Sequence, residues 1–152
     1  MEEKKSLPRV LILDDDPLYL RVWEKVFRGI ADCHYCLTND PYAAMALLQS
    51  QPTDLVISDV VMPEEIGYNI ATLARKHQPG AAVVLTTGYD CQLSRFNLQD
   101  PHFHILYKPY RNISDVQRLI LHLLNRDGVF ADLSEDSVSD NPDYPDVKEW
   151  RL

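Results

Sequence analysis

Residues 10–17 read VLILDDDP, so that an apolar run of strand length ends in three carboxylates and a proline. The same form recurs downstream, because Asp59 closes a second apolar run and Thr87 and Lys108 close two more. In an open parallel α/β sheet the carboxyl ends of the strands share one crevice, where polar side chains gather. The stretch therefore predicts both a parallel sheet and the edge at which its functional groups meet.

Apolar runs alternate with helical patterns along the chain, and this alternation predicts five βα units that build one parallel sheet. The middle strands are apolar on both faces, as strands covered by helices on two sides must be. The predicted fold class is α/β, with a doubly wound, five-stranded parallel sheet. The expected strands are Arg9–Leu13, Asp32–Leu37, Asp54–Ser58, Ala82–Thr86 and Phe103–Tyr107.

Two helix boundaries can be predicted from single residues. Asp40 and Pro41 fit an N-cap and a first helical position, and they open a helix over Tyr42–Gln49. Gly29 is expected to end the preceding helix in a left-handed conformation. The apolar positions that define the first and the last helix are Val22, Trp23, Val26, Phe27, Ile30, Val116, Leu119, Ile120, Leu123 and Leu124.

The rest of the sequence predicts two further helices and a boundary between a folded domain and a tail. A third helix is expected over Ile66–His77, and a fourth, short or mobile one over residues 90–100, where apolar anchors are few. Beyond the last helix, acidic residues, serine and proline replace the periodic pattern. We expect an N-terminal extension over residues 1–8, a folded domain over 9–125, and an acidic tail, flexible or docked, over 126–152.

Composition narrows the class of protein. The 152 residues suit one domain of ordinary size, and the net charge of −8 comes from 15 basic and 23 acidic residues. The basic residues are scattered, which argues against direct binding to nucleic acid or to an anionic membrane. The apolar runs are strand-sized, so neither a signal peptide nor a membrane span is expected.

The cysteines and histidines carry no clear metal or redox pattern. The three cysteines are an odd number, which favours reduced thiols in a cytoplasmic protein. Cys33 and Cys36 lie in an expected strand, where their spacing points the two side chains to opposite faces. His102 and His104 lack a matched second pair of ligands, so a structural role is favoured for them.

Asp14, Asp15 and Asp59 are expected to meet in the crevice, where three carboxylates repel one another unless a cation lies between them. Mg²⁺ takes oxygen ligands and keeps several waters, so it suits such a cluster. The sequence therefore predicts a metal-assisted phosphoryl site.

These residues carry a resemblance that covers the whole predicted domain. Residues 9–125 resemble a response regulator receiver domain of two-component signalling, a family with a flavodoxin-like, three-layer fold. The matching segments are LILDDDP at 11–17, VISDVVMP at 56–63, LTTG at 85–88 and YKPY at 107–110. Each segment alone is a weak signal, but their order and their positions at strand ends make the set specific.

The resemblance implies a role for each matched residue. Asp59 would be the phosphoacceptor, with Mg²⁺ bound directly by Asp15 and by the Val61 carbonyl, and mostly through water by Asp14. Thr87 would contact the phosphoryl group in preference to Thr86. Lys108 would clamp the phosphoryl group, and the family has the following Lys-Pro peptide bond in the cis form.

The resemblance also implies partners. The donor would be a sensor histidine kinase or a phosphotransfer protein, and the output would be an unknown protein. That protein would bind the face formed by the weak helix, the strand Phe103–Tyr107 and the last helix. The resemblance leaves a homodimer open. In one position the chain departs from the family, because Ile105 replaces the aromatic residue that usually moves with the threonine.

Two other functions remain open. A constitutive binding module would keep the fold without control by phosphorylation, and Ile105 is compatible with it. A haloacid-dehalogenase-like phosphatase would use Asp14 as its nucleophile, but its further acidic pair could come only from Asp127, Asp132 or Asp136, in the tail.

Overall fold

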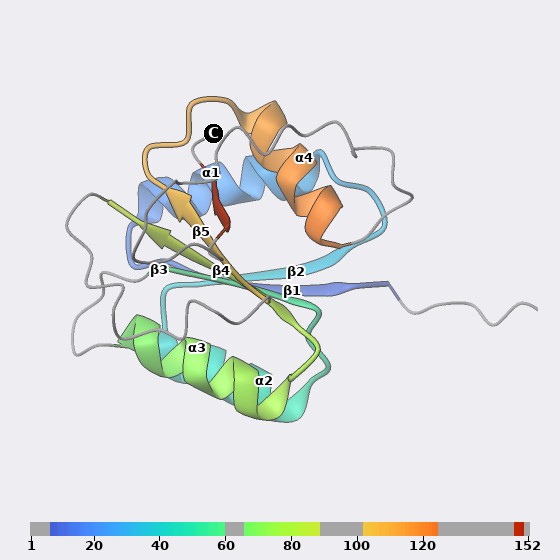
Figure 1. Ribbon diagram of the computed structural model, residues 1–152, viewed down its shortest axis with the longest axis vertical. Coiled ribbons are helices and arrows are strands. Elements are labelled where there is room, and N and C mark those ends of the chain that lie inside the picture. The colour runs from blue at the N-terminus through green and yellow to red at the C-terminus, as the bar shows by residue number, and fades with distance from the viewer. Residues whose placement is uncertain (1–6, 60–65, 89–101, 125–147, 151–152) are drawn as a thin grey trace, which may run out of the picture.

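The computed structural model describes residues 7–59, 66–88, 102–124 and 148–150. One parallel sheet runs through them in the order β2-β1-β3-β4-β5-β6 (Figure 1). The five expected strands are confirmed, and β6 extends the sheet beyond β5. The strands are β1 (Arg9–Leu13), β2 (His34–Thr38), β3 (Leu55–Asp59), β4 (Ala82–Thr87), β5 (Phe103–Tyr107) and β6 (Lys148–Trp150).

The boundaries of three strands differ from expectation. Strand β2 begins at His34 because Asp32 has a φ of 59°, in the left-handed region, where a strand cannot start. Cys33 therefore lies before the strand. Strands β3 and β4 each run one residue further than expected, so Asp59 and Thr87 are their last residues. The backbones of both residues are therefore held by pairing with the neighbouring strand.

Helices cover both faces of the sheet, with α1 and α4 on one face and α2 and α3 on the other (Figure 1). Side-chain caps start three of them, because Asp16, Asp40 and Asn112 accept hydrogen bonds from backbone N–H groups in the first turn. The expected helix over residues 90–100 lies outside the described residues. The helices are α1 (Pro17–Arg28), α2 (Pro41–Ser50), α3 (Ile66–His77) and α4 (Ile113–Leu123).

The hydrophobic core forms two layers, one on each side of the sheet. Alternate residues of each central strand enter opposite layers, as Leu11 and Ile12 of β1 do. The layer under α1 and α4 is centred on Trp23 and Phe27, whose side chains are almost fully buried. This packing holds the carboxyl ends of β1, β3, β4 and β5 at one edge.

The end of α1 corrects one expectation. Gly29 has φ −84° and ψ −2°, a right-handed conformation, so the expected left-handed cap is wrong. A Cβ atom at Gly29 would lie 2.1 Å from Nε2 of Gln117, and this nitrogen donates a 3.1 Å hydrogen bond to the carbonyl of Val26. A side chain at position 29 would therefore have to displace the end of Gln117, the α4 side chain that caps the end of α1.

Gly29→Ala should change the free energy of unfolding differently in two backgrounds. In wild type the new methyl group displaces Gln117, and the lost hydrogen bond of about 1 kcal/mol roughly cancels the gain from a stiffer unfolded chain. In a Gln117→Ala background only the gain remains, so the free energy of unfolding should rise by about 0.4–1 kcal/mol. Urea unfolding of the four proteins checks this, and an equal effect in both backgrounds would contradict it.

Candidate functional site

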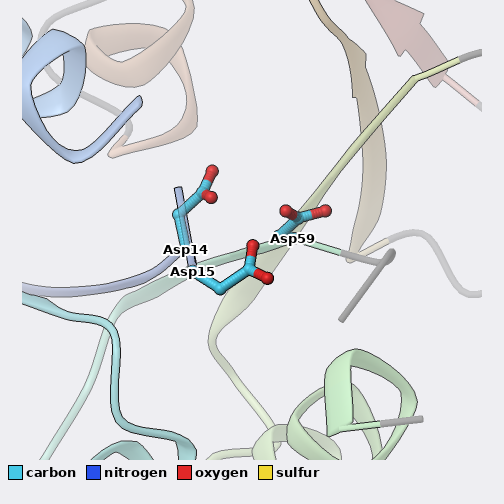
Figure 2. A group of neighbouring side chains, drawn as sticks. All are labelled: Asp14, Asp15 and Asp59. Atoms are coloured by element: carbon cyan, nitrogen blue, oxygen red, sulfur yellow. The ribbon is translucent and has the colours of Figure 1, made fainter. Parts of the chain in front are cut away.

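Three aspartates meet at the carboxyl edge of the sheet. Asp14 directly follows β1 and is 1% exposed, Asp59 ends β3 and is 5% exposed, and Asp15 is exposed to solvent. Figure 2 shows their carboxylates turned toward a common space, and one ligating oxygen of each lies within 4.8 Å of the others. The predicted cluster is therefore formed, with one face open to water.

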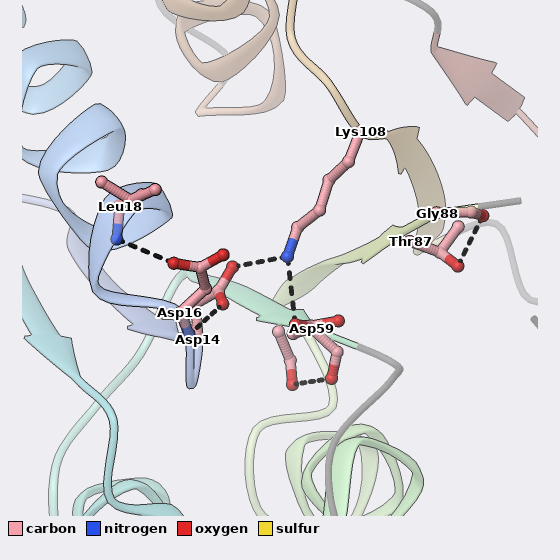
Figure 3. A network of polar contacts seen from close by, with 8 residues as sticks. Asp14, Asp16, Leu18, Asp59, Thr87, Gly88 and Lys108 are labelled. Carbon is pink, nitrogen blue, oxygen red and sulfur yellow. Dashed lines mark hydrogen bonds and ion pairs between the residues drawn. The ribbon is translucent and has the colours of Figure 1, made fainter.

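Lys108 joins the two buried carboxylates. Its ammonium nitrogen lies 2.9 Å from Oδ2 of Asp14 and 3.0 Å from Oδ2 of Asp59 (Figure 3). The contact with Asp59 has the geometry of a hydrogen bond, whereas the contact with Asp14 is an ion pair with poorer alignment. The Lys108–Pro109 peptide bond is cis, as the resemblance implied.

The surroundings change the protonation of Lys108. Burial alone lowers the pKa of this ammonium group, but the contact with Asp14 and the charges of Asp59 and Asp14 outweigh burial and raise the pKa above its ordinary value. Lys108 is therefore firmly protonated at neutral pH and compensates part of the negative charge of the cluster.

The raised pKa of Lys108 predicts alkaline sensitivity. The contribution of protonated Lys108 to the free energy of unfolding should be complete below the ordinary lysine pKa of about 10.4. It should be lost as the pH rises through the higher pKa that Lys108 has in the folded chain. Burial also raises the pKa of the Tyr110 hydroxyl, so Tyr110 should likewise make the folded chain less stable as the pH rises in this alkaline range. Urea unfolding from about pH 9 to pH 12 should therefore show a steeper decline for wild type than for Lys108→Gln, with Tyr110→Phe as the control for the tyrosine. Parallel curves for wild type and Lys108→Gln would contradict the assignment.

Thr87 lies at the end of β4 beside the cluster. Its side chain is fully buried, and its hydroxyl donates a 3.0 Å hydrogen bond to the carbonyl of Gly88 (Figure 3). The Lys108 backbone N–H donates a 2.7 Å hydrogen bond to the carbonyl of Thr87, so the ends of β4 and β5 are tied together. Thr87 is therefore joined through the backbone to Lys108, the residue whose side chain contacts Asp59.

The other residues considered in the sequence lie outside the described part of the site or away from it. Val61 lies outside the described residues. Cys36 lies in the edge strand β2 and Cys33 just before it, far along the sheet order from β5, and neither is in a disulfide. Sequence reasoning missed Tyr19, whose ring lies under the Lys108 ammonium at 4.1 Å. Only its position in the first turn of α1, just after the acidic stretch, could have drawn notice.

A doubly wound parallel sheet with acidic residues at the carboxyl ends of β1 and β3, a hydroxyl at the end of β4 and a lysine after β5 defines a receiver-type switch domain. The family model for the response regulator receiver domain matches residues 10–120. The chain belongs to this family, whose standard role is that of a phosphorylation-dependent switch.

The chain is also similar in sequence to individual curated proteins. The two-component response regulator ORR22 of Oryza sativa subsp. indica is 30% identical over an alignment of 139 positions, which covers 83% of this chain and 20% of that protein. The transcription factor prr1 of Schizosaccharomyces pombe is 25% identical over an alignment of 152 positions, which covers 95% of this chain and 26% of that protein. The chain thus spans only about a fifth to a quarter of the length of these two curated relatives.

Solved structures support the fold. A CheY-like response regulator receiver domain protein from Methanospirillum hungatei JF-1 superposes with a TM-score of 0.65 at 26% identity, over 79% of this chain and 95% of that chain. Among the described residues, no helix is long and apolar enough to cross a membrane.

Proposed function

We propose that Asp59 accepts a phosphoryl group from a histidine kinase or a phosphotransfer protein. A carboxylate oxygen of Asp59 attacks phosphorus, the bond from phosphorus to the donor's imidazole nitrogen breaks, and an acyl phosphate forms. The observation that carries this proposal is the position of Lys108, which holds one ammonium group against both Asp59 and Asp14 at 3.0 and 2.9 Å. Its charge lies where the transferring oxygens would arrive.

The acidic cluster suits Mg²⁺. Three carboxylates and one ammonium group leave an excess of two negative charges, which a divalent ion neutralises. We propose that Asp14, Asp15, Asp59 and the backbone carbonyl of Val61 hold the ion, with Asp14 acting mostly through water. When bound, Mg²⁺ would supply charge neutralisation for the phosphoryl oxygens and orient them.

Thr87 is proposed to report the product. Its hydroxyl donates to Gly88 in the structure, and after transfer it would donate to a phosphoryl oxygen instead. Because the backbones of Thr87 and Lys108 are hydrogen-bonded, this exchange would shift the end of β4 together with the end of β5. Ile105 occupies the position where the family usually has the aromatic residue, and it is fully buried in the core. The switch would therefore operate without that aromatic residue.

The proposal extends to the organisation of the chain. Residues 9–125 would form the switching domain, residues 1–8 an extension and residues 126–152 a tail. The output partner would bind the face that includes β5 and α4, and the chain would act in the cytoplasm. Neither Cys33 nor Cys36 is in a disulfide, which is compatible with a reducing compartment.

Beryllofluoride with Mg²⁺, followed by amide NMR, tests the switch. The expected result is a set of shifts at Asp59 that spreads to Thr87 and to the backbone of β5, and that requires both Mg²⁺ and beryllofluoride. Asp59→Asn is the matched control and should show no such shifts. If wild type responds only locally, or not at all, the constitutive binding module becomes the better reading, which Ile105 already keeps open.

A further inference from the structure

The Lys108 ammonium group has a third neighbour besides its two carboxylates. The nitrogen lies 4.1 Å from the centroid of the Tyr19 ring, over its face, and the Lys108 side chain is only 13% exposed. A cation over the negative face of an aromatic ring is attracted to it, and more strongly where water is excluded. The ring therefore fills one side of an ammonium group whose other contacts go to Asp14 and Asp59.

The Tyr19 ring is itself held in place. The Tyr110 ring meets it edge to face, with centroids 5.3 Å apart and an interplanar angle of 75°. Tyr110 in turn meets Trp23 edge to face at 5.3 Å, and Trp23 is fully buried in the layer between α1 and the sheet. Three aromatic rings thus connect the position of Lys108 to the core under α1 and α4.

This support matters because lysine is flexible. Its four-carbon stem has many rotamers, and each ordering contact reduces the number that are populated. An aromatic face attracts the ammonium group without accepting a directed hydrogen bond from it, so the N–H groups stay available for the carboxylates. The ring fixes the lysine and leaves its donors aimed at Asp59.

We propose that Tyr19 is a positioning residue for phosphoryl uptake, which acts by holding the Lys108 ammonium group beside Asp59 before the donor arrives. This inference rests on the proposed roles of Asp59 and Lys108. The hydroxyl group of Tyr19 takes no part in it, so phenylalanine should replace tyrosine, whereas leucine should not.

Phosphorylation by acetyl phosphate at saturating Mg²⁺ tests the proposal. The initial rate, followed by intact mass, should fall roughly threefold to tenfold in Tyr19→Leu and stay within about twofold of wild type in Tyr19→Phe. In a Lys108→Gln background, Tyr19→Leu should change the rate by less than about twofold, since the ammonium group is gone. An equal loss with and without Lys108 would overturn the proposal and assign Tyr19 to general packing.

A second measurement does not depend on phosphorylation. The ring face should move the NMR signals of the Lys108 ε-methylene protons upfield in wild type and in Tyr19→Phe, and Tyr19→Leu should abolish this displacement. Thermal unfolding of each variant confirms that the comparison is made on folded protein. If wild type shows the ring effect but no phosphorylation, the proposed function fails while the contact stands. Phosphorylation without any ring effect would overturn the role of Tyr19 alone.

Discussion

Asp59→Asn should reduce phosphoryl uptake from acetyl phosphate by at least ~10³-fold while leaving the domain folded. The amide keeps the size of the carboxylate but is not a nucleophile, and its oxygen can still accept from Lys108, which lies 3.0 Å from Oδ2 in wild type. Lys108 also keeps its ion pair with Asp14. Intact mass after incubation with acetyl phosphate and Mg²⁺ measures the loss, and circular dichroism checks the fold.

Asp14→Asn is the matched control for this prediction. Asp14 is as buried as Asp59 and contacts the same ammonium group, but we expect it only to assist metal binding. Its variant should therefore still be phosphorylated, at a lower rate and with a higher requirement for Mg²⁺. The reverse pattern, with uptake lost in Asp14→Asn and retained in Asp59→Asn, would favour a haloacid-dehalogenase-like phosphatase.

Lys108→Gln should have a large effect on both chemistry and stability. Phosphoryl uptake should fall by about 10²–10³-fold, the range observed when a single preorganised donor to a transition state is removed. Asp14 and Asp59 would also lose the cation that both contact, although they are 1% and 5% exposed. Removal of one partner from a buried ion pair typically costs about 3–5 kcal/mol.

Mg²⁺ separates these two effects of Lys108→Gln. The ion should recover part of the free energy of unfolding, because it replaces the missing positive charge, but it should not restore the rate. Lys108→Arg retains the charge in a wider, planar group and should lose less stability than Lys108→Gln. Urea unfolding with and without Mg²⁺, together with the uptake rate, measures both quantities. A glutamine variant as stable as wild type without Mg²⁺ would show that Lys108 does not compensate the carboxylates.

The sheet and most of the site were predictable because their signals are local. Apolar runs of strand length ended at polar residues, and the structure confirms β1 and β5 with the expected bounds. The Asp40-Pro41 signal also predicted the start of α2, since a cap requires only neighbouring residues. The meeting of Asp14, Asp59 and Lys108 followed once parallel strands were assumed, because their carboxyl ends lie at one edge.

The features that were missed depend on contacts between distant segments. Gly29 suggested a left-handed cap, but its conformation is right-handed, and a Cβ there would meet Gln117, a residue of another helix. The Tyr19 ring is placed by Lys108 and Tyr110, and no spacing in the sequence relates these positions. Strand β6 has three residues and therefore no periodic pattern, so only the free edge of β5 could reveal it.

Strand β6 also differs from the other strands in the face of the sheet on which the helix before it lies. The connections through α1, α2 and α3 have one hand, because the step from β1 to β2 runs opposite to the other two and its helix lies on the opposite face. The step from β5 to β6 runs in the direction of the α3 step, but α4, the described helix between these two strands, lies on the α1 face. Parallel connections share one hand in about 98% of cases, and that preference requires the connecting helix on the usual face of the sheet. The described contacts that place β6 are therefore its backbone pairs with β5, which join His104, Ile105 and Leu106 to Lys148, Glu149 and Trp150.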